Sequence, residues 1–163
     1  MKTARLSKAF LVLLIGLFGV LVAVNNVFDY ESNFNFVQHV MLMDTTFPGN
    51  DLMWRSISSP IVHHAAYWLI IAGEMLTGVL CIVGSAALAK ASDQPRDIFI
   101  KAKRTAILGL TLGIFVWFFG FMTVAAEWFL MWQSQQWNGV QAAFRFIMCI
   151  SVVLLYLSQN DSD

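Results

Sequence analysis

The chain has 163 residues, of which 58% are hydrophobic and only 12% are charged, whereas about a quarter of a soluble domain is charged. Its 10 Lys and Arg residues balance 10 Asp and Glu residues, and this excludes the strongly basic surface that a nucleic-acid-binding protein needs. Because 14% of the residues are aromatic, the chain is not disordered either, and we expect an integral membrane protein.

Four stretches are apolar for long enough to cross a bilayer as helices, which takes about 20 residues. They run from about 8 to 27, 60 to 89, 103 to 132 and 139 to 157. We interpret the first as a retained helix rather than a signal peptide, because its apolar run is long and no clear cleavage motif follows Val24. The predicted fold class is all-α: a single membrane domain, 1–163, built as a four-helix bundle.

The segment between the first two spans, from about 28 to 59, is long enough to carry structure of its own. Residues 34–41 form a partly amphipathic stretch that predicts a helix lying in the membrane interface. The run TTFPGND, residues 45–51, indicates a turn, and residues 51–58 are a candidate second short helix. Ser59 followed by Pro60 is typical of a helix N-terminus, and it marks the start of the second span.

The basic residues predict the orientation of the spans. Eight of the 10 Lys and Arg residues lie before the first span or between residues 90 and 104. Positively charged segments stay in the cytoplasm, so we expect both termini inside and the 28–59 loop in the periplasm of a bacterial inner membrane. Trp68, Trp128, Trp132 and Trp137 lie near the expected outer ends of their spans, where an aromatic belt belongs.

Three ionisable residues, Glu74, Glu127 and Arg145, lie within the predicted spans. Each costs about 2.5 to 3.5 kcal/mol in the bilayer, and such groups therefore face a neighbouring helix or a site. A rise of about 1.5 Å per residue puts the three at one level in the outer leaflet. Tyr67 and Gln141 share helical faces with Glu74 and Arg145, which completes a predicted polar cluster.

Three roles are open for this cluster. The first is structural, with Arg145 paired to Glu127 or Glu74, and the spacing leaves open which carboxylate is the partner. The second is a ligand, metal or proton site, and the third is contact with a partner subunit. Packing between the helices is predicted from small residues: Gly109, Gly113 and Gly120 share one face of the third span with Glu127, and Gly109 and Gly113 form a close-packing motif.

The histidines give a separate metal hypothesis. His39, His63 and His64 lie in or beside the outer loop with Asp44 nearby, and imidazole with carboxylate suits zinc or copper. Neighbouring residues on a helix point about 100° apart, so His63 and His64 bind one ion only if a turn unwinds. No span offers a facing pair of histidines at depth, which disfavours haem.

Several runs resemble a family of small bacterial integral membrane proteins that is catalogued only as a domain of unknown function. They are EWFLMWQSQQWNG at 127–139, AAFRF at 142–146, FVQHVMLMDTTFPGND at 36–51 and HHAAYWLIIAGE at 63–74. Together these runs extend over most of the chain. The resemblance implies a four-span protein of the bacterial inner membrane, and it carries over neither an established activity nor a catalytic residue.

The function that we favour from the sequence is non-catalytic: an accessory, assembly or binding subunit of an inner-membrane complex, with a polar site facing the periplasm. One alternative is a metal, quinone or lipid-headgroup site with a redox or transport role. Another is a homo-oligomeric conduit. The expected partners are the lipid bilayer, a membrane protein or further copies of the chain, and nucleic acid is not among them.

Overall fold

The computed structural model describes residues 2–161, and no strand occurs among these residues. Its elements in chain order are α1 (Lys2–Phe28), α2 (Tyr30–Leu42), η1 (Met53–Arg55), α3 (Pro60–Lys90), α4 (Arg96–Ile114), η2 (Phe115–Trp128), η3 (Met131–Gln133) and α5 (Val140–Ser158). Four stretches are long and apolar enough to cross a membrane: α1, α3, α4 continued by η2, and α5. The predicted all-α, four-span fold is confirmed.

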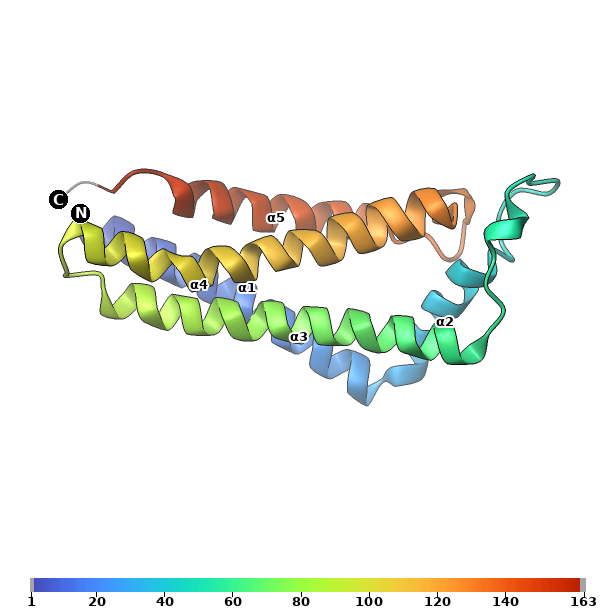
Figure 1. The fold of residues 1–163 in the computed structure, drawn as a ribbon, viewed down its shortest axis with the longest axis horizontal. Helices are drawn as coiled ribbons and strands as arrows, with labels where there is room; N and C mark the ends of the chain where they lie inside the picture. The colour runs from blue at the N-terminus through green and yellow to red at the C-terminus, as the bar shows by residue number, and fades with distance from the viewer. Residues whose placement is uncertain (1, 162–163) are drawn as a thin grey trace.

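The long helices lie lengthwise against one another (Figure 1). α1 begins, α5 ends and α3 connects to α4 at one end of the bundle, whereas α2, η1 and η3 lie at the other end (Figure 1). The most extensive helix pairing is between α1 and α3, followed by that between α3 and α4. Large apolar side chains along the outside of the spans are exposed, among them Leu69 at 74% and Leu155 at 69%. Such a surface is expected where helices contact lipid.

The ends of the spans follow local sequence. α3 begins at Pro60 with Ser59 at its N-cap position, although the Ser59 side chain makes no capping hydrogen bond. α4 begins at Arg96, directly after Pro95, and thus starts earlier than the sequence indicated. Its π-helical continuation ends at Trp128, since Leu130 takes a left-handed conformation with φ 56° and turns the chain into η3.

α1 and α3 cross at very short range because glycines face each other there. A Cβ added at Gly78 on α3 would lie 2.6 Å from the main-chain nitrogen of Val20 and 2.9 Å from the carbonyl oxygen of Gly16, both on α1. No side chain fits into that gap. Small residues at helix crossings are how membrane helices approach one another without help from the hydrophobic effect.

The third span changes its helical pitch midway. After Ile114 the backbone continues as the π-helix η2, which is wider than an α-helix and holds more residues in each turn. Gly109 lies before the change, and a Cβ there would be 2.8 Å from Sγ of Cys81 on α3. Gly120 lies after it, and a Cβ there would meet nothing within 4 Å. The π-helix therefore turns Gly120 away from the face on which the α-helical period put it.

The end of the bundle away from the chain termini is capped by α2 and the loop that follows (Figure 1). α2 buries Val37, Val40 and Met41, so the amphipathic helix expected over 34–41 exists and is longer than predicted. The predicted turn contains Gly49 at φ 77°, in the left-handed region that favours glycine. The short helix expected over 51–58 is reduced to the single 3₁₀ turn η1.

Candidate functional site

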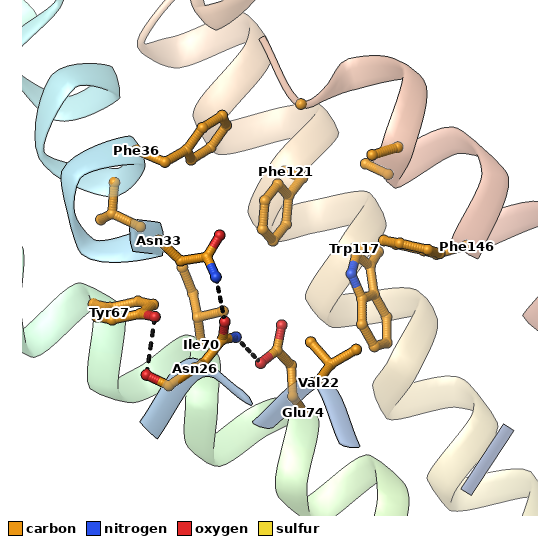
Figure 2. A pocket seen from close by; sticks show the side chains of 14 residues that line it. Val22, Asn26, Asn33, Phe36, Tyr67, Ile70, Glu74, Trp117, Phe121 and Phe146 are labelled. Atoms are coloured by element: carbon orange, nitrogen blue, oxygen red, sulfur yellow. Dashed lines mark hydrogen bonds between the residues drawn. The ribbon is translucent and has the colours of Figure 1, made fainter. Parts of the chain in front are cut away.

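The side chain of Asn26, near the end of α1, connects three helices. Its amide nitrogen donates a hydrogen bond of 2.7 Å to Oε2 of Glu74 on α3. Its amide oxygen accepts one of 2.8 Å from Asn33 on α2 (Figure 2). The hydroxyl of Tyr67 on α3 donates to the main-chain carbonyl of Asn26 at 3.2 Å. One amide therefore fixes the ends of α1, α2 and α3 relative to one another.

Three of the four residues of this network are buried, and Asn33 is the exposed one. Asn26 is 7% exposed, Glu74 2% and Tyr67 1%. A buried carboxylate is stable only when hydrogen bonds replace the water that it loses. Asn26 supplies such a bond to one oxygen of Glu74, while the second oxygen points into an adjacent cavity and has no protein partner within residues 2–161 (Figure 2).

The cavity has a volume of about 250 Å³ and is enclosed by α1, α2, α3, η2 and α5. Apart from Asn26, Asn33, Tyr67 and Glu74, its lining side chains are apolar. Trp117 on η2 and Phe146 on α5 form the wall opposite α3, with their ring centroids 5.6 Å apart and an edge-to-face arrangement (Figure 2). The result is an aromatic chamber with one carboxylate oxygen directed into it.

The rim of the cavity lies between α2 and α5. Asn33 and Ala142 line the cavity and are themselves exposed, so the chamber is accessible on this side. Phe36 narrows the opening, because its ring approaches Gly139 closely enough that a Cβ there would lie 3.0 Å from Cζ of the ring. A molecule that enters here would pass Phe36 before it reaches Glu74.

A second hollow of about 140 Å³ adjoins the first. It shares four lining residues with the cavity: Phe36, Val37, Ile70 and Phe121. All of its lining side chains are apolar. The rings of Phe36 and Phe121 lie 6.5 Å apart and belong to both walls. The two hollows together offer a polar position at Glu74 and an apolar position beyond the two phenylalanines.

The structure does not bring the predicted polar cluster together. Glu74 and Tyr67 meet at Asn26, but the side chains of Glu127, Arg145 and Gln141 are exposed. Within residues 2–161 no ion pair joins Arg145 to either glutamate. Glu127 lines a separate open groove that also contains Arg55 from the outer loop. The predicted position of Glu127 required α-helical spacing through the third span, whereas the π-helix η2 changes the direction of the side chains between Phe115 and Trp128.

The predicted metal residues are also apart. His39 pairs with Asp44, with Nδ1 and Oδ2 2.6 Å from each other. His63 is buried and donates from Nε2 to the main-chain carbonyl of Ile57 at 2.7 Å. His64 stacks on an aromatic ring of α2 with a centroid distance of 4.1 Å. In the part of the chain that the structure describes, no group of three or more His, Cys, Asp and Glu side chains is arranged to hold a metal ion.

Sequence reasoning missed Asn26 and Asn33. Both are amides without charge, and a search for ionisable groups in the spans passes over them. A usable signal was present, because Asn25 and Asn26 are the first polar residues after the long apolar run of α1. A buried asparagine in a membrane helix needs a partner on another helix, just as an acid does.

The fold and the cavity define the class of protein: a small, multi-pass integral membrane protein with four apolar helices and a pocket with a buried carboxyl group among them. A family described as predicted small integral membrane proteins (DUF2165) matches residues 4–160. The chain belongs to this family. No curated protein and no solved structure matches the chain.

Proposed function

We propose that the protein is a non-catalytic binding subunit of the bacterial inner membrane, and that its Glu74 cavity holds a small amphipathic molecule through a hydrogen bond to Glu74. The observation that carries this proposal is the free oxygen of Glu74. One oxygen of the buried carboxylate is bonded to Asn26, and the other is directed into the cavity (Figure 2). A carboxylate within a membrane is costly and marks a functional site more often than not.

The lining and the volume of the cavity indicate which class of ligand it can hold. Ligand pockets are mostly apolar and hold a few polar groups that fix orientation. At about 250 Å³ the chamber fits a single ring system or a short chain rather than a whole phospholipid. A carboxylate oxygen accepts hydrogen bonds, so a bound group that donates one, such as a hydroxyl or an amine, complements Glu74. A hydroxylated ring with an apolar substituent, as in a quinol, has this chemistry.

The π-helix η2 also supports a binding site at the Glu74 cavity. π-helical segments are rare in helices and occur frequently at functional sites. η2 contributes Trp117 and Phe121 to the cavity wall. The seam between α3 and α4 is packed through Gly109 and Gly113, whereas η2 beyond it turns large aromatic rings toward the space in front of Glu74.

The charge distribution supports an orientation with the cavity in the outer half of the membrane. Lys2, Arg5 and Lys8 belong to α1 at the end of the bundle where α3 ends and α4 begins, and the last residue of α3 and the first turns of α4 carry five of the other seven basic residues (Figure 1). Basic segments stay on the cytoplasmic side. The cavity is built from the far ends of α1 and α5 and from α2, and it would therefore open toward the periplasmic leaflet.

The test is native mass spectrometry of the chain extracted gently from its own membranes, for wild type and Glu74→Gln. Glutamine keeps an oxygen for Asn26 but presents an N–H₂ group to the cavity, so a donor replaces an acceptor. We expect wild type to carry a bound small molecule, and the variant to lose about 10- to 100-fold in affinity, the value of one hydrogen bond to a charged group.

Glu127→Gln is the matched control, because it makes the same chemical change in an exposed glutamate outside the cavity. We expect it to retain the ligand. A wild-type chain that is bare, or a ligand that both variants hold equally, would overturn the proposal. A second protein in the spectrum with no small molecule would support an accessory subunit without a ligand, and a defined homo-oligomer would support the conduit.

A further inference from the structure

A second polar assembly lies at the opposite end of the bundle from the Glu74 cavity. Lys8 on α1 and Lys103 on α4 both contact the carboxylate of Asp161, which follows α5. The Lys8 Nζ lies 2.8 Å from Oδ1 of Asp161. Lys8 is 3% exposed, Lys103 6% and Asp161 8%, so these charges are buried, unlike the exposed pair of Lys2 and Asp93.

The charges in this assembly do not balance. Two ammonium groups share one carboxylate, and their other hydrogen-bond acceptor is also shared: the main-chain carbonyl of Gln159 lies 3.0 Å from Lys8 Nζ and 3.1 Å from Lys103 Nζ. An ammonium group has three N–H donors. Within residues 2–161 each lysine therefore has one N–H without an oxygen acceptor, and the pair keeps an excess positive charge. The rings of Tyr156 and Phe99 lie against Lys8 and Lys103, with ring centroids 5.5 Å and 5.7 Å from the Nζ atoms.

There is space beside the lysines for a further group. A hollow of about 130 Å³ is bounded by Lys8, Arg5 and Tyr156 together with the chain around Asp161. The chain there is held in place by Arg96, whose Nε donates to the main-chain carbonyl of Asp161 at 2.7 Å. Asp161 thus contacts both lysines and borders a small hollow that is lined by Lys8, Arg5 and Tyr156.

We propose that the Lys8–Lys103 site binds a phosphate oxyanion, that of an anionic phospholipid, and that Asp161 fills part of this site as an internal competitor. A phosphate has more acceptor oxygens than a carboxylate and can use the N–H groups that Asp161 leaves without a partner. The location favours a lipid as the source, because basic pockets between helices at the cytoplasmic surface bind anionic headgroups. This site is separate from the Glu74 cavity and does not depend on the function proposed for that cavity.

The experiment places the full chain, wild type or Asp161→Asn, in nanodiscs of phosphatidylcholine with a small fraction of phosphatidylglycerol. Native mass spectrometry then counts the phosphatidylglycerol molecules that stay bound. If Asp161 fills the site for nine-tenths of the time, its removal raises the apparent affinity about tenfold. Asp93→Asn removes an exposed charge at the same end, and we expect no gain from it.

Two further variants locate the binding. Adding Lys8→Gln to Asp161→Asn is expected to abolish the gain, whereas adding Lys101→Gln, an exposed lysine at the same end, is expected to preserve it. A second arm uses phosphatidylcholine alone with inorganic phosphate. Stabilisation of Asp161→Asn by inorganic phosphate would identify free phosphate as a source, and stabilisation by phosphatidylglycerol alone would identify the lipid.

The proposal is overturned if neither phosphate source binds Asp161→Asn more tightly than wild type, or if the gain survives Lys8→Gln. Should Asp161→Asn not fold, wild type carries the test through its unfolding temperature. Phosphatidylglycerol must then raise that temperature above its value in phosphatidylcholine, and Lys101→Gln but not Lys8→Gln must keep the shift. An equal temperature in both lipids would contradict the site.

Discussion

At the scale of single residues, both polar atoms of the Asn26 side chain form hydrogen bonds to other helices. Its N–H₂ group donates to Glu74 and its oxygen accepts from Asn33, so one neutral side chain satisfies a buried acid and positions α2. The sequence identified Glu74 by its charge, and Tyr67 because it shares a helical face with Glu74. Asn26, the residue that contacts both, carries no charge, so a search for ionisable groups in the spans passes over it.

Replacing Asn26 should cost more than replacing its neighbour. Asn26→Ala leaves a buried carboxylate oxygen without its donor, and we expect the free energy of unfolding to fall by about 1 to 3 kcal/mol. Asn25→Ala changes the same residue type at an exposed position and should change stability by less than about 0.5 kcal/mol. Unfolding by sodium dodecyl sulfate in mixed micelles, followed by circular dichroism, measures both. Equal losses would show that the hydrogen bond to Glu74 contributes nothing.

At the scale of helices, the bundle uses two kinds of contact. α1, α3 and the first part of α4 pack closely through small residues such as Gly78 and Gly109. The outer part of the third span, η2, instead packs through aromatic rings and leaves space between helices. The close-packed half holds the long helices in place, and the loosely packed half contains the cavity.

Adding one methyl group should distinguish these halves. Gly78→Ala puts a Cβ 2.6 Å from the main chain of α1, and either the helices separate or the backbone distorts. We expect a loss of about 1 to 3 kcal/mol in the free energy of unfolding. Gly120→Ala adds the same group where nothing lies within 4 Å, and it should be neutral or stabilising by up to about 1 kcal/mol. The same detergent titration measures both, and equal behaviour of the two variants would contradict the close crossing.

The helices could be predicted from the sequence, whereas the directions of single side chains on them could not. Hydropathy predicted all four spans, and amphipathicity predicted α2, because both depend on averages over many residues. The predicted cluster of Glu74, Glu127 and Arg145 depended on the phase of single side chains along a helix. A switch from α-helical to π-helical hydrogen bonding after Ile114 alters that phase for Glu127, and the composition of the span gives no sign of it.

At the scale of the whole molecule, the two polar assemblies lie at opposite ends of an apolar bundle. The first is the buried carboxyl group of Glu74, which faces a cavity. The second, at the end where the chain termini lie, is excess positive charge at Lys8 and Lys103, partly neutralised by Asp161. Between them the core is apolar, formed by residues such as Val12, Leu110 and Ile150. The assembly of Lys8, Lys103 and Asp161 also attaches the chain after α5 to α1 and α4.

The assembly of Lys8, Lys103 and Asp161 predicts that the stability of the protein depends on pH. Burial alone would raise the pKa of Asp161, but hydrogen bonds from Lys103 and Lys8 outweigh it, and the pKa lies below its ordinary value. A carboxyl group with a lowered pKa in the folded state stabilises the protein fully above its unfolded pKa of about 3.9. That contribution is lost as the pH falls through the lower, folded pKa.

Wild type should therefore exceed Asp161→Asn in unfolding free energy by roughly 3 kcal/mol at neutral pH, the cost of breaking a buried pair. Below about pH 4 the gap between the two should narrow. Detergent unfolding of both proteins between pH 7 and pH 3 measures it, with Asp93→Asn as the exposed control. A gap that stays constant over this range would show that the pKa of Asp161 is the same in the folded and the unfolded protein.

The bond between Asn26 and Glu74 has a consequence for how the protein is made. Synthesis runs from the N-terminus, so α1 enters the membrane before α3. Asn26 is thus the earlier of the two to arrive, and its partner follows 48 residues later. Insertion of an acid is costly for an isolated helix. When α3 leaves the translocon, however, an amide donor is already in the bilayer to receive Glu74, and the glycines of α1 and α3 let the two helices close on each other at once.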